Sequence, residues 1–214
     1  MTERGKYIVI EGHDGTGKSA QRDLLSQRLG TLGITVAHTL EPGGTPIGEI
    51  LRTTLLDGSL ERQRETNLLL LTANRLELWT QFIKPKLQNG IWVISDRSWW
   101  SSVAYQGFGE GISIDKVTAT TKEFAGEDYM QPDIGIILSL NDEQERQRRT
   151  AQSAATQKDT FEQKDSDFQQ RVKEGYEYAV RHLGAVAVEF SPDTSKEQVA
   201  DLVWQKIEPL LETR

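Results

Sequence analysis

The stretch Gly12-His-Asp-Gly-Thr-Gly17-Lys18-Ser19 decides the fold of this 214-residue chain. It matches the pattern G-x4-G-K-[ST], and it lies directly after a short β-branched run and before an amphipathic one. Glycines let the backbone curl so that successive amides face phosphate oxygens. The following helix adds the partial positive charge of its N-terminus. The sequence therefore predicts a nucleotide-binding P-loop between a strand and a helix.

Two side chains of this motif carry the expected chemistry. Lys18 is placed to reach the β- and γ-phosphates of ATP, and the Ser19 hydroxyl is placed to ligate Mg²⁺. His13 occupies a variable position of the motif, where no step requires a base. The expected ATP-binding residues are Gly12, His13, Asp14, Gly15, Thr16, Gly17, Lys18, Ser19 and Ala20. A P-loop alone serves kinases, ATPases, GTPases and motors, so the rest of the chain must decide the reaction.

Composition excludes several classes of protein. The chain has 25 lysine and arginine residues against 32 aspartate and glutamate residues, a net charge of −7. So acidic a chain is a poor general binder of nucleic acid. It has no cysteine, which excludes disulfides and thiolate metal sites. The polar start and the short apolar run Tyr7 to Ile10 predict neither a signal peptide nor a membrane span. We expect a cytoplasmic protein that binds neither nucleic acid nor membrane.

Short β-branched runs alternate with longer amphipathic runs, which is typical of βαβ units and a parallel sheet. Strands are expected at Tyr7 to Glu11, Ile34 to Leu40, Ile91 to Ser95, Ile134 to Leu140 and Ala185 to Phe190. Helices are expected at about 18–32, 46–56, 64–88, 113–126, 142–152, 165–183 and 195–212. The prediction is a single α/β P-loop domain over residues 1–214, with three layers in which helices flank a five-stranded parallel sheet.

One segment differs in composition. Thr150 to Thr160 is rich in Ala, Gln, Ser and Thr and has no large apolar side chain, so it adds little to a core. Such a segment is either an ordinary surface loop or a movable cover over a site. We expect a small flexible lid at about residues 148–163.

A second polar group is expected at the same edge of the sheet as the P-loop. Asp96 and Arg97 follow the third strand directly, at the edge where ligands bind in open parallel sheets. An arginine there can pair with a phosphate through two N–H groups, and Asp96 can orient Mg²⁺. The turn Glu41-Pro-Gly-Gly-Thr45 ends the second strand, and Arg52 follows on the next helix. Several cations beyond the P-loop favour an acceptor that already carries charge.

Leu71 and Arg75 stand four residues apart and therefore share one face of the following helix. An arginine directed into an otherwise apolar pocket suits a nucleobase carbonyl. Taken singly, such an arginine is more typical of a solvated surface.

Several short stretches occur in order along the chain: Gly12 to Ser19, Glu41 to Thr45, Leu71-Thr-Ala-Asn-Arg75, Asp96-Arg97, Ala104-Tyr-Gln-Gly107, Pro132-Asp133 and Phe161-Glu-Gln163. In this order and spacing they resemble the thymidylate kinase family of nucleoside monophosphate kinases. The resemblance implies a five-stranded parallel sheet, ATP with Mg²⁺ as phosphoryl donor, thymidine monophosphate (dTMP) as acceptor, and a homodimer.

The resemblance implies roles at the phosphate end of the site. Arg97 matches the arginine that binds the acceptor phosphate, with Arg52 assisting. Asp14 resembles the carboxylate that holds the sugar 3′-hydroxyl and approaches the acceptor phosphate. Lys18, Arg97 and Asp14 are thus expected to be catalytic, and Glu41 and Pro42 are expected to contact the substrate.

At the base end, Arg75 matches the arginine that bonds the thymine carbonyl. Ser102 and Gln106 stand where the family reads the remaining base edge. Tyr105 matches the residue that crowds the ribose 2′ position and so favours a deoxy sugar. Leu71 stands where the family usually stacks a phenylalanine on the base, so an aliphatic contact is expected there instead.

The resemblance also implies a cation from the lid. Gly15, where some relatives carry an arginine, resembles the bacterial subtype whose lid supplies the transition-state cation. Thr160 replaces the arginine expected in the lid, which leaves Arg148, Arg149 and Lys158 as substitutes. Arg148 and Lys158 are the residues expected to act.

Three alternatives stay open at this point. A deoxynucleoside kinase would use Asp96 as a base on a neutral hydroxyl, because Asp96-Arg97-Ser98 resembles a motif of that family. Another deoxynucleotide monophosphate kinase would differ in base preference, as Leu71 allows. A non-catalytic nucleotide-binding regulator would keep the P-loop and need no acceptor pocket.

Overall fold

The predicted parallel sheet is present in the computed structural model, which describes residues 3–153 and 165–212. Its five strands are β1 (Tyr7–Gly12), β2 (Val36–Leu40), β3 (Trp92–Asp96), β4 (Ile134–Leu140) and β5 (Val186–Phe190). They pair in parallel in the order β2-β3-β1-β4-β5. Because β1 lies in the middle, the loop after it is flanked by the ends of β3 and β4.

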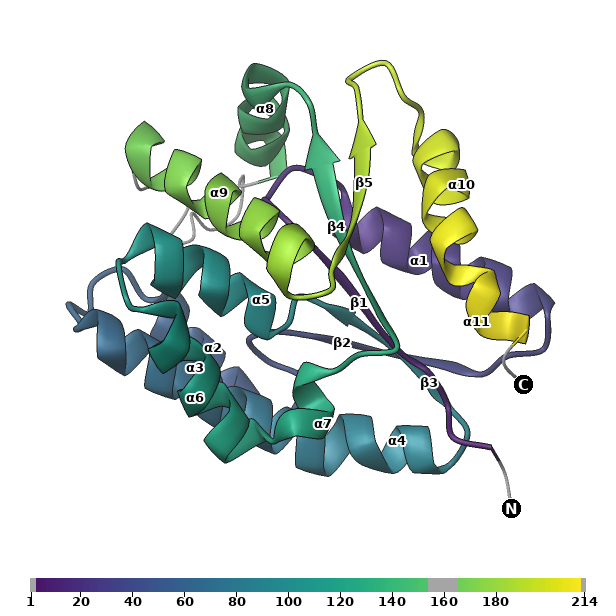
Figure 1. Cartoon of the computed structure of the whole chain (residues 1–214), viewed down its shortest axis with the longest axis horizontal. Helices are drawn as coiled ribbons and strands as arrows, with labels where there is room; N and C mark the ends of the chain where they lie inside the picture. The colour runs from purple at the N-terminus through teal and green to yellow at the C-terminus, as the bar shows by residue number, and fades with distance from the viewer. Residues whose placement is uncertain (1–2, 154–164, 213–214) are drawn as a thin grey trace.

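Helices cover both faces of this sheet (Figure 1). On one face lie α1 (Lys18–Thr31), α10 (Lys196–Ile207) and α11 (Pro209–Glu212). On the other lie α2 (Pro46–Leu56), α3 (Arg64–Leu78), η1 (Trp79–Ile83), α4 (Lys84–Gln88), α5 (Trp99–Ser102), η2 (Val103–Gly109), α6 (Ile114–Ala125), α7 (Glu127–Met130) and α9 (Ser166–His182). The helix α8 (Glu143–Ser153) stands at the carboxyl ends of the strands. In the part of the chain that is described, no helix is both long and apolar enough to cross a membrane.

The hydrophobic core has two parts, one on each face of the sheet, because side chains alternate in direction along each strand. Ile8 and Ile10 of β1 pack with Leu25 and Leu29 of α1 and with the apolar face of α10. Tyr7 and Val9 point to the opposite face, where they join side chains of α3, α6 and α9. Successive strand residues point to opposite faces, so covering both faces requires the nearly continuous apolar runs seen in the sequence.

The structure corrects the helix predicted at 64–88. It is split into α3, one wide turn of π-helix (η1) and α4, which begins beside Pro85. Proline lacks the N–H that an α-helix needs and clashes with the carbonyl four residues earlier, and the wide turn accommodates both. The predicted helix 195–212 likewise breaks before Pro209.

Three short helical segments, α5, η2 and α7, were not predicted. Nearly all of η2 is buried, so its sequence lacks the amphipathic pattern by which a helix is recognised. All five tryptophans are core residues with at most 7% exposure: Trp79, Trp92, Trp99, Trp100 and Trp204.

The helical segments α9 and η2 pack closely together at Gly175. A Cβ added at Gly175 would lie 2.5 Å from the Cα atom of Ala104. This contact is too short, and only a shift of the backbone could relieve it. Gly30 in α1 is the opposite case, because an added Cβ there meets nothing within 4 Å.

We predict opposite effects for two glycine substitutions in helices. Gly175→Ala should destabilise the protein by roughly 1–3 kcal/mol, because it forces α9 away from η2. Gly30→Ala should stabilise it by roughly 0.5–1 kcal/mol, because alanine loses less backbone entropy on folding. Urea denaturation of both variants measures the difference. A Gly175→Ala protein as stable as Gly30→Ala would contradict the packing described.

Candidate active site

A large cavity of about 1410 Å³ opens at the carboxyl edge of the sheet. Residues 14–21 of the P-loop and α1 form its floor, and Asp96 and Arg97 lie beside them. The end of β2 and the helix α2 line one side, with Glu41, Pro42 and Arg52. The helix α8 and the segment between β5 and α10 line the other, with Arg148 and Arg149. The predicted phosphate-binding groups therefore share one cavity.

The P-loop is shaped by its glycines and closed by its own side chains. Gly15 has a φ of +83°, and a Cβ added there would lie 2.6 Å from the carbonyl oxygen of Arg146 in α8. Residue 15 must therefore be glycine for both its conformation and its contact with α8. The Thr16 hydroxyl and the Lys18 ammonium both donate to the carbonyl oxygen of His13, over 2.8 and 3.1 Å. These contacts hold Lys18 inside the curl of the loop.

One oxygen atom of Asp14 joins the two principal cations of the site. Its Oδ1 accepts from Lys18 Nζ over 3.2 Å and from Arg97 Nη2 over 2.6 Å. Burial alone would raise the pKa of the Asp14 carboxyl, but the attraction of Arg97 and Lys18 outweighs it and holds the pKa well below its ordinary value. Asp14 is therefore ionised at neutral pH, and a single anionic oxygen fits between the two cations.

Arg97 adopts a strained backbone. Among the residues that the structure describes, it is the one non-glycine residue with a positive φ, at +77°. That conformation costs a non-glycine residue roughly 1–2 kcal/mol, so the surrounding structure must hold it. The Arg97 N–H donates to the carbonyl of Ile10 over 2.9 Å, and the Ser95 hydroxyl donates to the Arg97 carbonyl over 2.8 Å. This conformation directs the Arg97 guanidinium toward Asp14 of the P-loop.

Glu11 contributes to this turn and was missed by sequence reasoning. It is fully buried, and its Oε1 accepts the backbone N–H groups of Ser98 over 2.7 Å and Ser101 over 3.0 Å. A carboxylate inside an otherwise apolar strand, directly before the P-loop, was the signal that could have found it, because buried charges need dedicated partners.

Arg146 was missed as well. It is only 7% exposed, pairs with Glu143, and places Nη1 3.4 Å from the Asp14 carbonyl. Burial, and then the positive charge of Arg146, lower the pKa of the His13 imidazole to about 3. His13 is therefore neutral at neutral pH. Nothing in the sequence distinguished Arg146 from the other arginines of α8.

The metal-binding prediction rests on Ser19 and Asp96. The Ser19 hydroxyl donates to Asp96 Oδ2 over 3.0 Å, and both residues line the cavity beside Lys18. Residues 3–153 and 165–212, this site included, contain no cluster of three acidic or histidine side chains that could hold a metal ion. A hydroxyl and one carboxylate fit Mg²⁺, which commonly takes its remaining ligands from water and substrate phosphates.

Arg52 is tied to the turn that ends β2. Its Nη1 donates to the carbonyl of Pro42 over 2.7 Å, so the guanidinium lies on the cavity wall that Glu41 and Pro42 also form. The helix α2 begins at Pro46, as predicted, and the Thr45 hydroxyl caps it by accepting from Gly48 N over 3.0 Å. This cap orients the helix that carries Arg52.

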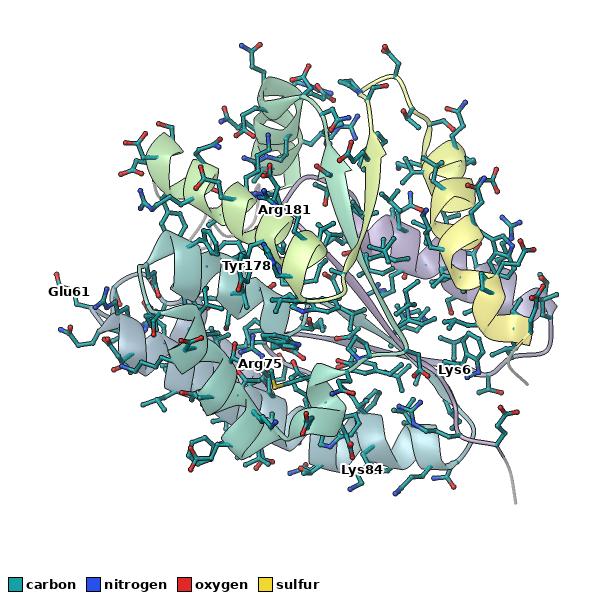
Figure 2. All side chains as sticks on the ribbon, in the orientation of Figure 1. Lys6, Glu61, Arg75, Lys84, Tyr178 and Arg181 are labelled. Atoms are coloured by element: carbon teal, nitrogen blue, oxygen red, sulfur yellow. The ribbon has the colours of Figure 1, made fainter. Side chains whose placement is uncertain are left out.

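The residues expected to read the base lie outside the cavity. Arg75 is 1% exposed and sits within the helical layer (Figure 2). It donates to Glu41 Oε2 over 3.0 Å and to the Ser102 hydroxyl over 2.8 Å. The second Glu41 oxygen accepts from the Tyr129 hydroxyl over 2.6 Å. Arg75 thus has a buried partner that the sequence did not indicate.

The other base-end residues surround this network. Ser102, Tyr105 and Gln106 are buried, and Leu71 is half-buried. The Arg97 guanidinium lies 5.4 Å above the Tyr105 ring, so Tyr105 packs directly against an arginine that lines the cavity. None of the four lines the cavity, and their base-reading roles stay predictions.

The lid assignment is only partly covered by the described residues. Arg148 lines the cavity on α8, but it is mostly exposed and its guanidinium pairs with Glu145 over 2.7 Å. Arg149 pairs with the same carboxylate over 2.8 Å. Lys158 and most of the expected lid lie outside the described residues, so their roles remain predictions.

The fold and the site together define a P-loop phosphotransferase. A family model described as thymidylate kinase matches residues 10–203. The chain is 42% identical over 173 residues to the thymidylate kinase of Nitrosospira multiformis, covering 81% of this chain and 82% of that one. It is 35% identical over 208 residues to the thymidylate kinase of Halothermothrix orenii, covering 97% and 99%.

A solved structure agrees. The thymidylate kinase of Ehrlichia chaffeensis superposes with a TM-score of 0.75 at 27% identity, over 96% of this chain and 99% of that one. The chain belongs to the thymidylate kinase family. This confirms the resemblance seen in the motifs. Members of this family take ATP as phosphate donor with Mg²⁺.

Proposed function

We propose that this protein transfers the γ-phosphoryl group of ATP to dTMP, giving dTDP and ADP. One observation carries the proposal: Lys18, expected on the donor phosphates, and Arg97, expected on the acceptor phosphate, meet on a single oxygen of Asp14. In the transferring phosphoryl group, charge is spread over oxygens between donor and acceptor. The spacing of the two cations suits such a group, which would take the place of the carboxylate oxygen between them.

The acceptor needs no general base. A phosphate monoester has a second pKa of about 6 and is largely dianionic at neutral pH, so the task is alignment and charge neutralisation. Arg97 and Arg52 would bind the acceptor phosphate, and Lys18 would bind the donor phosphates. Mg²⁺, held by Ser19 and Asp96, neutralises phosphate charge when bound. Arg148 would add a cation once it leaves Glu145, and Lys158 is the second candidate from the lid.

Base recognition would use the layer behind Tyr105. Arg75 has five N–H donors, of which three make the hydrogen bonds to Glu41, Ser102 and Ser98. An N–H group beyond these three would donate to a carbonyl oxygen such as that of thymine. Gln106 would pair with the rest of the base edge. Leu71 would pack on the ring, and Tyr105 would crowd the ribose 2′ position.

The acceptor is tested by measuring ADP release with ATP·Mg²⁺ and each of thymidine, dTMP and the other nucleoside monophosphates. We predict the highest kcat/KM with dTMP and none with thymidine, because Arg97 and Arg52 require an anionic acceptor. In the same assay, Arg97→Ala should lose most turnover while ATP affinity, measured by calorimetry, stays nearly unchanged. Preference for thymidine would indicate a deoxynucleoside kinase, and preference for another monophosphate would indicate a different base specificity. No acceptor-dependent ADP would indicate a regulator.

We further propose that the protein works in the cytoplasm as a homodimer. Its exposed large apolar side chains include Ile47 and Ile50 on α2, Leu69 and Leu76 on α3, and Phe124 on α6, all 37–63% exposed. The helix α3 contacts both α2 and α6, so these side chains lie on adjacent helices of one face. A second copy presenting the same face would cover them, as in a two-fold interface.

Sedimentation velocity tests this assembly. Replacing Leu69 and Leu76 by glutamate should convert the dimer to a monomer, because each substitution buries charge in an apolar interface. Leu32→Glu is the matched control, since Leu32 is 52% exposed at the end of α1 on the opposite face of the sheet. A monomeric wild-type protein, or a dimer unaffected by the double substitution, would contradict the proposed interface.

A further inference from the structure

The side chain of Tyr176, on α9, ends beside Arg97 and the start of the P-loop, although its position in the sequence indicated no role. It is 3% exposed. Its hydroxyl lies 3.0 Å from Arg97 Nη1, 3.1 Å from Glu11 Oε2, 3.3 Å from Ser101 Oγ and 3.4 Å from the Gly12 carbonyl oxygen. Four polar groups, from β1, the turn after β3 and α5, therefore surround one phenolic oxygen.

The direction of these hydrogen bonds follows from the groups involved. A guanidinium can only donate, so Arg97 donates to the phenolic oxygen. The single phenolic proton then goes to Glu11, whose carboxylate is closer than the Gly12 carbonyl and is the stronger acceptor. Burial and the nearby negative charge of Glu11 raise the pKa of Tyr176 well above its ordinary value, so the hydroxyl keeps its proton. The result is a directed chain from Arg97 through Tyr176 to Glu11.

Several further hydrogen bonds fix Glu11, the last member of this hydrogen-bond series. Its other oxygen already accepts the N–H groups of Ser98 and Ser101, and the Ser101 hydroxyl donates to Oε2 over 2.8 Å. The same carboxylate therefore holds the backbone turn that begins at Arg97 and, through Tyr176, the end of the Arg97 side chain. With both its ends held, the guanidinium has Nη2 directed at Asp14.

The Tyr176 ring is itself fixed by packing. It makes edge contacts with the rings of Tyr105 at 6.3 Å and His13 at 5.4 Å. The neighbouring Gly175 lies against the backbone of η2, and this contact sets the distance between α9 and η2. A phenylalanine would keep all of this packing and lose only the oxygen.

We propose that Tyr176 is a positioning residue for phosphoryl transfer: its hydroxyl, anchored on Glu11, holds the Arg97 guanidinium in the orientation that binds the acceptor phosphate. This inference rests on the proposed function, because it requires Arg97 to bind that phosphate. Tyr176 does not touch either substrate in this account and acts through Arg97 alone.

Tyr176→Phe tests the hydroxyl, with Tyr178→Phe as the matched control on the same helix. The Tyr178 ring packs against Phe108 and His182 (Figure 2 labels it) and not against the P-loop. We expect Tyr176→Phe to lower kcat with dTMP about 10-fold, the effect of one lost hydrogen bond to a charged group. The dissociation constant of ATP alone should stay close to wild type, and the melting temperature should fall by only a few degrees, because Glu11 keeps its bonds from Ser98 and Ser101. Tyr178→Phe should match wild type in all of these measurements.

A double-mutant cycle separates positioning from a general structural role. Because Tyr176 acts through Arg97, adding Tyr176→Phe to Arg97→Ala should leave the residual rate unchanged. Equal losses in both backgrounds would overturn the inference. So would a wild-type kcat in Tyr176→Phe, or a parallel loss of ATP affinity and melting temperature.

The wild-type assay distinguishes the two levels of failure. If wild type shows no dTMP-dependent turnover, the proposed function and this inference fall together. If wild type turns over dTMP and Tyr176→Phe does so equally well, only the role of Tyr176 is overturned.

Discussion

The attraction of Lys18 and Arg97 to one oxygen of Asp14 is the interaction on which the rest of the site depends. Two cations brought this close repel each other strongly where water is partly excluded, so an anion between them is required. In the structure that anion is a carboxylate of the P-loop itself. In the proposed reaction, phosphate oxygens would take over this role. The P-loop therefore contains both the donor site and the group that prepares the acceptor arginine.

The parallel sheet makes this arrangement attainable. Because β1, β2 and β3 run in the same direction, their carboxyl ends deliver the P-loop, the Glu41–Pro42 turn and Arg97 to one edge. The helical layer then holds the strained turn at Arg97 through Glu11, which accepts hydrogen bonds from Ser101 of α5 and Tyr176 of α9. Hydrogen bonds to the buried Glu11 carboxylate thus stabilise the strained backbone at Arg97. Strain held in this way by the surrounding structure is common at functional sites.

The sequence predicted what depends on local pattern, and it missed what depends on distant partners. The P-loop, the five strands and the start of α2 follow from glycine spacing, apolar runs and turn chemistry, and the structure contains them. The partnership of Arg75 with Glu41 and Tyr129 could not be predicted, because it joins residues from three separate elements. Tyr176 gave no signal either, since a tyrosine on the apolar face of a helix has the pattern of an ordinary core residue.

The central claim is that Asp14 occupies the position between the two cations that phosphate oxygens take in the reaction. Calorimetric titration of pyrophosphate into wild type, Asp14→Asn and Asp57→Asn tests it most directly, since Asp57 also lines the cavity but contacts neither Lys18 nor Arg97 in the described structure. With the competing carboxylate removed, Asp14→Asn should bind pyrophosphate about 10-fold more tightly than wild type, whereas Asp57→Asn should bind it nearly as wild type does. Equal or weaker binding by Asp14→Asn would contradict the account.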